Sequence, residues 1–264
     1  LCFIFMSDVL LHEILSQDYP SYYYIPLSGG ASSAFVYKIV IPDGALVLKQ
    51  TSLAFHHEFT QEIDVLQWLN GKIKVPSYQW HKHIANTNWL CTSWIEGLTL
   101  DSIDAAWPIK ERVAVYADTL KLIHSIPLTT KTPKRLLPDV LAEAERRVTE
   151  GLVDTKEFEE VYQGYSAEQL LQQLFNSIPT ENDLVFTHGD FCPKNLLFLN
   201  KQLSGIIDWG RGGIADRYQD LALAIRSIRH EWGAAYVRTF LSIYGLTEID
   251  HQKLEFYTLL DECF

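Results

Sequence analysis

The sequence predicts an α+β protein with two unequal lobes. Short apolar runs rich in strand-forming residues occupy about residues 28–96, whereas the chain after Gly97 shows mainly helical patterns. The chain is also apolar enough for a sizeable core, because 47% of its 264 residues are hydrophobic. We expect a small N-terminal lobe over residues 1–95, with an antiparallel sheet and one helix, and a larger, mainly helical lobe over residues 96–264.

The small lobe contains a predicted β-hairpin. Residues 34–41 and 45–49 are apolar runs, and the Pro-Asp-Gly sequence at 42–44 between them is typical of a tight turn. Residues 89–95 form another run of strand-forming residues. Over residues 58–69, apolar side chains recur at helical spacing, and the Asn-Gly pair that follows predicts the end of a helix.

The larger lobe is predicted to contain six helices and a short β-rich interruption. The helices are expected at about residues 110–124, 138–150, 166–177, 216–229, 232–244 and 250–262. Ser166 and Gln169 have the spacing of a capping box at the start of the third of these helices. The predicted strands cover residues 184–187, 196–199 and 203–207.

The charge of the chain argues against binding to nucleic acid. The sequence has 22 Lys and Arg against 33 Asp and Glu, a formal net charge of −11, whereas phosphate backbones need a basic surface. An acidic surface instead favours a cationic partner. No apolar run is long enough for a membrane span, and four scattered cysteines are typical of reduced thiols. We therefore expect a cytoplasmic protein, either a monomer or a weak homodimer.

The clearest chemical motif is His188-Gly-Asp-Phe-Cys-Pro-Lys-Asn195, followed by Asp208 at the end of the next predicted strand. A hairpin of this length can bring Asp190, Asn195 and Asp208 together. Asn195 and Asp208 supply the oxygen ligands that Mg²⁺ prefers, and Asp190 is then left to accept the proton of an attacking hydroxyl. An Asp-capped turn would explain each motif alone, but the two motifs at this spacing favour kinase-type phosphoryl transfer.

The small lobe has residues that suit a nucleotide. Glycines precede the first predicted strand, where backbone N–H groups can approach phosphates and Ser32 adds a hydroxyl. Lys49 ends the second strand and is a candidate phosphate contact, provided that Glu62, or the competing Glu58, fixes its position. An ordinary loop and an exposed lysine are the alternatives. The pattern GxxxxGK[ST] is missing from the sequence, which excludes a P-loop fold.

These residues resemble the aminoglycoside 3′-phosphotransferases. The resemblance covers about residues 28–264, and its most specific parts are the stretch Gly210–Ala222 and the terminal Leu260-Asp-Glu-Cys-Phe264. It implies a bilobal protein-kinase-like fold, the cofactors ATP (with GTP as an alternative) and Mg²⁺, and transfer of the γ-phosphate to the 3′-hydroxyl of an aminoglycoside antibiotic such as kanamycin or neomycin. Such a reaction would confer antibiotic resistance.

The resemblance also implies roles for individual residues. Asp190 matches the catalytic base, and Asn195 and Asp208 match the metal ligands. The nucleotide-binding positions are Ser32, Lys49, Glu62 and the backbone of Ser93 and Ile95. The aminoglycoside-binding positions are Glu157, Glu160, Arg211, Asp261, Glu262 and the carboxylate of Phe264, and Glu231 is the substrate-loop residue that we favour over His230.

Two other functions stay open from the sequence. A kinase of the same fold could act on another small alcohol, such as choline, homoserine or a methylthio-sugar. A catalytically silent nucleotide-binding module is the second alternative, although Lys49, Asp190, Asn195 and Asp208 are all present. The acidic runs near Glu157 and Asp261 favour a polycationic substrate, whereas solvated helix faces are their simpler explanation.

Overall fold

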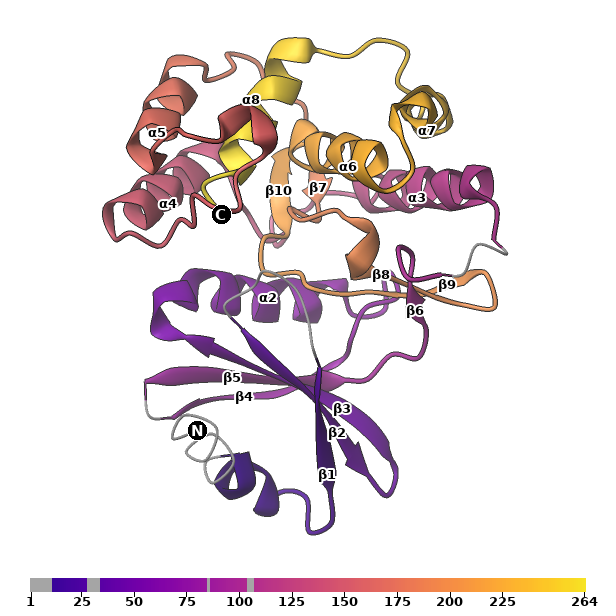
Figure 1. Cartoon of the computed structure of the whole chain (residues 1–264). Coiled ribbons are helices and arrows are strands. Elements are labelled where there is room, and N and C mark those ends of the chain that lie inside the picture. The colour runs from indigo at the N-terminus through magenta and orange to yellow at the C-terminus, as the bar shows by residue number, and fades with distance from the viewer. Residues whose placement is uncertain (1–10, 28–33, 85, 104–106) are drawn as a thin grey trace.

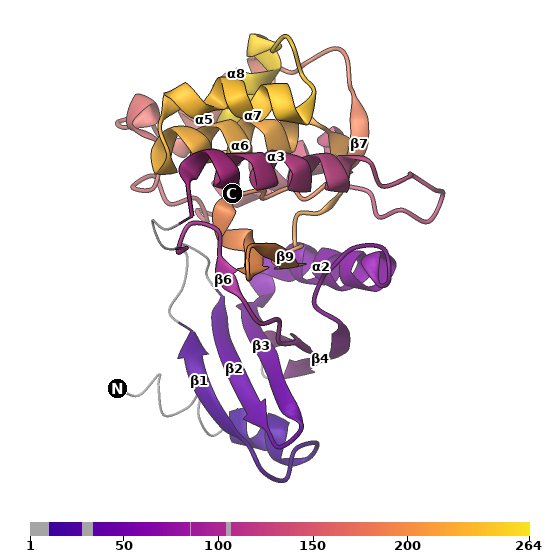
Figure 2. The same ribbon diagram turned by 90° about the vertical axis from the view of Figure 1, so that its right-hand side faces the viewer.

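A computed structural model describes residues 11–27, 34–84, 86–103 and 107–264 of the chain. A five-stranded sheet lies at one end of the molecule and a group of helices at the other, with helix α2 between them (Figure 1). The view turned by 90° shows the same two parts, with the short strands β6 and β9 near their junction (Figure 2). The predicted α+β class with a sheet lobe and a helical lobe is confirmed. Within the described residues, no helix is long and apolar enough to cross a membrane.

The large sheet is antiparallel throughout, with the strand order β1-β2-β3-β5-β4. Its strands are β1 Tyr23–Leu27, β2 Phe35–Ile41, β3 Gly44–Ser52, β4 Tyr78–Ile84 and β5 Thr87–Ser93. The predicted hairpin is the pair β2–β3, and the third predicted strand is β5. Strands β1 and β4 were not predicted. Both lie at sheet edges and are partly exposed; β1 contains a proline, which is unfavourable for a central strand, and polar residues interrupt β4.

The alternation of β3 places Lys49 on the face of the sheet that carries α2. Leu46 and Leu48 point to the opposite face and pack with Ile39, Trp89 and the helical residues 11–16 in a small core. Helix α2, His56–Leu69, belongs to the larger core that also includes the second lobe. It begins two residues earlier than predicted.

All six predicted helices of the second lobe are present. They are α3 Ile109–His124, α4 Leu137–Thr149, α5 Ala167–Asn176, α6 Tyr218–Glu231, α7 Val237–Tyr244 and α8 His251–Asp261. The capping box of Ser166 and Gln169 at the start of α5 is confirmed. Helix α7 is shorter than predicted, because Gly233 has a positive φ of 96° and a 3-10 turn, Ala234–Tyr236, comes before the helix.

Five short strands hold the loops that carry the sequence motif. β7 Leu184–Thr187 pairs with β10 Gly213–Asp216, and β6 Leu98–Thr99, β8 Leu196–Leu199 and β9 Gln202–Ile206 form a second small sheet. Residues 188–195 connect β7 to β8 and include the 3-10 turn Pro193–Asn195. The β8–β9 hairpin then returns the chain, and Ile207 N–H donates to the carbonyl oxygen of Asn195 at 2.9 Å. This hairpin brings Asp208 back to Asn195.

A buried ion pair joins β10 to α8. The Nζ of Lys253 lies 2.7 Å from Asp216 Oδ2, and only 1% of the Asp216 side chain is exposed. Asp216 also accepts hydrogen bonds from the backbone N–H groups of Asp183 and Tyr218 at 2.8 and 2.9 Å. One carboxylate therefore holds three segments around the β7–β10 pair.

We expect Asp216→Ala to lower the free energy of unfolding by about 3–5 kcal/mol, because it leaves the Lys253 ammonium buried without its partner. Urea unfolding followed by circular dichroism measures this loss. The matched control is Glu111→Ala, whose ion pair with Lys201 is more than half exposed on both sides. The control should cost about 0–1 kcal/mol. Equal losses in the two variants would contradict the role assigned to Asp216.

Candidate active site

A buried carboxylate of α6 fixes the loop that follows β7. Asp220 accepts hydrogen bonds from the backbone N–H groups of His188 and Gly189, both at 2.7 Å. Its Oδ2 also lies 3.0 Å from His124 Nε2 of α3, and Tyr244 contacts the other ring nitrogen at 2.7 Å. Asp220 is fully buried, so these contacts are shielded from water. Sequence reasoning did not identify Asp220 as part of the site, since it lies 25 residues beyond the end of the motif at Asn195.

Gly189 allows this loop to pass close to the segment after Asp208. Its φ is +84°, a backbone conformation that residues with a side chain rarely adopt. A Cβ atom at this position would lie 1.9 Å from the carbonyl oxygen of Arg211. The glycine of the motif is therefore required by close packing between the two loops.

The structure brings Asp190 and Asn195 together. The side-chain amide of Asn195 donates to both the backbone oxygen and Oδ2 of Asp190, each at 2.9 Å. Burial raises the pKa of Asp190, Arg211 opposes this rise, and the charge of Asp208 adds to it. A fixed carboxylate with a raised pKa is suited to accept a proton from a bound hydroxyl.

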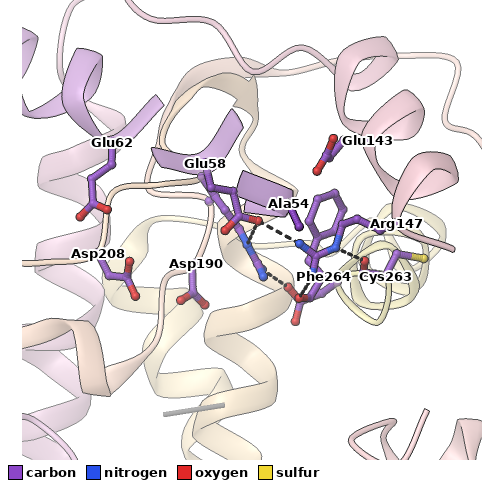
Figure 3. Close-up of polar contacts among 12 residues, drawn as sticks. Ala54, Glu58, Glu62, Glu143, Arg147, Asp190, Asp208, Cys263 and Phe264 are labelled. Carbon is purple, nitrogen blue, oxygen red and sulfur yellow. Dashed lines mark hydrogen bonds and ion pairs between the residues drawn. The ribbon is translucent and has the colours of Figure 1, made fainter. Parts of the chain in front are cut away.

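Lys49 connects the sheet to the third motif residue. Its Nζ lies 3.0 Å from Glu62 Oε2 on α2 and 2.7 Å from Asp208 Oδ1. Glu62 is thus the partner of Lys49, whereas Glu58, the alternative weighed from the sequence, points to Arg147 and Arg211 instead. Figure 3 shows Glu62, Asp208 and Asp190 in one region of the site, with Glu58 next to them.

The charges of this group support one another. Burial alone would lower the pKa of Lys49, but Asp208 and Glu62 more than offset it, and the pKa is raised. The ammonium of Lys49 in turn lowers the pKa of Asp208. Burial raises the pKa of Glu62; Lys49 opposes this rise, and the charge of Asp208 adds to it. At neutral pH the site therefore holds a charged lysine and a charged Asp208.

The donor set of Asn195 and Asp208 fits a small, hard cation. The Asn195 amide nitrogen is bonded to Asp190, so the amide oxygen is the atom that could act as a ligand. Asp208 has a positive φ of 64°, a strained conformation that is common at functional sites. Its side chain is 40% exposed, so a ligand can reach it. In the part of the chain that the structure describes, no three His, Cys, Asp or Glu side chains gather as a metal site. A cation here would need further ligands from water or phosphate.

The other predicted nucleotide-binding positions are less defined. Ser32 lies outside the described residues. Ser93 ends β5, and its backbone N–H donates to the carbonyl oxygen of Ser77 at 2.9 Å. Ile95 follows in the connection to β6 and packs against Gly205, where an added Cβ would lie 2.4 Å from Ile95 Cδ1. Ser93 thus lies at the end of a strand of the large sheet and Ile95 lies against β9, and their nucleotide-binding role stays a prediction.

A second group of charges surrounds the end of α8. Arg211 Nη1 donates to Asp261 Oδ1 at 3.0 Å. Arg226 of α6 contacts Asp261 as well, and lies 3.3 Å from Glu159 and 3.7 Å from Glu262. We call Glu159, Asp261 and Glu262 the acidic pocket. Arg226 and Glu159 were not predicted. Glu157, Glu159 and Glu160 lie close together in the sequence, and no local pattern indicates which of them faces α8.

The remaining predicted substrate residues are placed differently. Glu157 and Glu160 are exposed, while Glu159 between them makes the contact with Arg226. Glu231 ends α6, and its Oε1 lies 3.3 Å from Nδ1 of the neighbouring His230. The ring of Phe264 lies 5.1 Å from the guanidinium of Arg211. The structure thus brings Asp261 and Phe264 to Arg211 and Glu262 to Arg226, but places Glu157 and Glu160 at the surface.

We expect Lys49→Met to destabilise the protein in a pH-dependent way. Without the ammonium, Glu62 and Asp208 face each other, so their folded-state pKa values rise above those of the unfolded chain. A raised carboxylate pKa favours the folded state at low pH and loses that benefit as the pH rises. The free energy of unfolding should fall by about 3 kcal/mol at pH 8 and by less at pH 5. Urea unfolding at both pH values, with Lys201→Met as control, tests this, and equal losses would refute it.

Comparison with known proteins shows the family to which the chain belongs. The family model of the phosphotransferase enzyme family matches residues 24–257. An aminoglycoside 3′-phosphotransferase of Niallia circulans is 38% identical over 204 residues, 77% of this chain and 78% of that protein. One from Streptomyces fradiae is 35% identical, and the match covers 95% of this chain and 98% of the relative.

Solved structures show the same fold. A crystal structure of an aminoglycoside-3′-phosphotransferase of type VIII superposes with a TM-score of 0.86 at 32% identity, covering 97% of this chain and 98% of the other. An aminoglycoside phosphotransferase of Streptomyces rimosus, in complex with ADP and streptomycin, has a TM-score of 0.80 at 24% identity, with 97% of each chain covered. At this level of identity, the similarity to the Streptomyces rimosus protein shows a shared fold only. The chain therefore belongs to the phosphotransferase enzyme family, among the aminoglycoside 3′-phosphotransferases.

Proposed function

We propose that this enzyme transfers the γ-phosphate of ATP to the 3′-hydroxyl of aminoglycosides of the kanamycin and neomycin class, and so confers antibiotic resistance. The observation that carries the proposal is the position of the acidic pocket beside Asp190. Arg211 connects the two, because its charge acts on the pKa of Asp190 and its side chain bonds to Asp261. An acceptor with several ammonium groups can bind these carboxylates while it presents a hydroxyl to Asp190.

The residues of the site divide the reaction among them. Asp190 orients the acceptor hydroxyl and takes its proton as the new O–P bond forms and the bond between the β- and γ-phosphates breaks, which releases ADP. Lys49 and Ser32 would hold the phosphates. Asn195 and Asp208 would hold Mg²⁺, which when bound neutralises negative charge on the phosphate oxygens.

The nucleotide is proposed to bind between the lobes. The ADP complex of the Streptomyces rimosus enzyme, which shares the fold, supports an adenine nucleotide, and GTP is the alternative donor. The base would contact the backbone of Ser93 and Ile95. Val47 lies on β3 where an aromatic ring would stack more strongly on the base, so we expect base contacts to come mainly from the backbone.

A kinase for another small alcohol is the alternative function. The acidic pocket argues against it, since a small alcohol with one charge or none does not need Glu159, Asp261 and Glu262 together. We also infer a cytoplasmic location. ATP is the proposed donor, and Cys91, Cys192 and Cys263 of the described chain are free thiols. A monomeric or weakly dimeric state stays a prediction.

We expect Asp190→Ala to lower kcat for kanamycin phosphorylation by about 10²–10⁴-fold, because the acceptor hydroxyl loses its base. A coupled assay for ADP release measures turnover. Lys49 and Glu62 are untouched by the change, so the Kd of a nonhydrolysable ATP analogue should stay within about twofold of the parent value. Near-normal turnover in this variant would show that Asp190 is not the base.

The acidic pocket should respond to pH through Glu262. Burial raises the pKa of Glu262 to about 7, so its negative charge is present at pH 8 and mostly lost at pH 6. Glu262→Gln should therefore weaken kanamycin binding by about tenfold at pH 8 and by much less at pH 6. Isothermal titration calorimetry at each pH gives the ratio of the variant's Kd to the parent's Kd. Protonation of the drug itself cancels in this ratio, because both proteins bind the same drug. A ratio that does not change with pH would exclude Glu262 from the pocket.

A further inference from the structure

We propose that Glu58 is a positioning residue that links the last residues of α8 and the chain segment after it to the nucleotide-binding Lys49. Glu58 lies on α2, outside both proposed substrate sites, and was considered from the sequence only as a partner for Lys49. This inference rests on the proposed function, because it assigns Lys49 to the nucleotide and the segment 261–264 to the aminoglycoside side.

The first link is the helix itself. Glu58 and Glu62 are four residues apart on α2, so their side chains extend from the same side of the helix, one turn apart. Glu62 contacts Lys49 at 3.0 Å. A helical turn is stiff, so a rotation or shift of α2 that displaces Glu58 also displaces Glu62 and its lysine.

The second link crosses from α2 to the helical lobe. Arg147 Nη1 of α4 lies 3.3 Å from Glu58 Oε1, and Arg211 Nε lies 3.7 Å from the same oxygen. Both arginine side chains are largely buried, whereas a quarter of the Glu58 side chain is exposed. The carboxylate of Glu58 therefore forms ion pairs with two guanidinium groups of the helical lobe.

The third link joins these arginines to the end of the described chain. Arg147 Nε donates to the carbonyl oxygen of Cys263 at 2.9 Å, and its Nη2 donates to that of Phe264. Arg211 holds Asp261 at 3.0 Å. Figure 3 shows Arg147 between Glu58 and the last two residues, with dashed contacts to both.

The charge balance explains why Glu58 matters. Arg135, Arg147 and Arg211 all lie within 5.1–5.4 Å of the Phe264 ring. Burial lowers the pKa of Arg135 to about 10, and the neighbouring charge of Arg211 contributes to this shift. Guanidinium groups gathered in this way repel one another. Burial lowers the pKa of Arg147, and the charge of Glu58 opposes this shift. At Arg211, Glu58 and Asp261 more than offset burial, and the pKa is raised. The loss of Glu58 should loosen the contact between α2 and the arginines.

Other contacts keep α2 attached when Glu58 is changed. Gln61 Nε2 donates to the carbonyl oxygen of Gly212 at 2.6 Å, and Arg146 donates to that of Ala54 at 2.9 Å. We therefore expect Glu58→Gln, which keeps the shape of the side chain, to fold normally. Thermal unfolding of the variant checks this before any binding is measured.

The test measures the affinity of the whole protein for a nonhydrolysable ATP analogue with Mg²⁺, by isothermal titration. Glu58→Gln should raise this Kd by about fivefold or more, although residue 58 does not touch the nucleotide-binding lysine. Phe264→Ala should weaken binding in the same direction. The Kd of the double variant should exceed that of Glu58→Gln by no more than about twofold. Both changes act on the same two arginines, because the Glu58 carboxylate and the Phe264 ring each contact Arg147 and Arg211. Glu111→Gln, which removes an exposed carboxylate elsewhere, should leave the Kd unchanged.

The inference would be overturned by a Glu58→Gln protein that binds the analogue within about twofold of the parent. Fully additive effects of Glu58→Gln and Phe264→Ala would also overturn it, since a general loss of structure predicts additivity and a shared link does not. The proposed function is tested separately. A parent protein that binds the nucleotide but fails to phosphorylate kanamycin would contradict that function, while the Kd values would still decide the role of Glu58.

Discussion

The arrangement of the site depends on the ammonium group of Lys49 and the two carboxylates that it holds. One belongs to α2 and the other follows β9, so a single side chain of the sheet joins three parts of the fold. Removing two carboxylates from water is costly unless a cation compensates them. The same compensation keeps Asp208 charged and places it beside Asn195 and Asp190. Structure and proposed chemistry thus rest on the same contact.

Much of this could be predicted from the sequence, because the signals are local. The hairpin has a turn sequence between two apolar runs, α2 has helical spacing, and the motif from His188 to Asn195 has a fixed spacing to Asp208. The edge strand β4 could not be predicted, since its residues alternate between half-buried and exposed positions and polar residues interrupt its sequence. The pairing of Asp220 with the motif loop was also missed. It depends on how α6 packs beneath the loop, which no local pattern encodes.

The substrate side was predicted less well, for a physical reason. Acidic residues near a helix end can face solvent or a partner with the same sequence pattern. The structure separates these cases: Glu159 faces Arg226 and the end of α8, whereas Glu157 and Glu160 are exposed. Arg226 already compensates the acidic pocket, so a bound polycation would share these carboxylates with it. Affinity should then come from several modest contacts together with the acidic surface of the whole chain.

The most direct test of the central claim is the position of the phosphate on the product. The protein is incubated with ATP, Mg²⁺ and kanamycin, and the product is mapped by phosphorus and proton NMR. We expect a phosphate on the 3′-oxygen and no transfer to an analogue that lacks the 3′-hydroxyl. Phosphorylation at another hydroxyl, or equal turnover of the 3′-deoxy analogue, would contradict it.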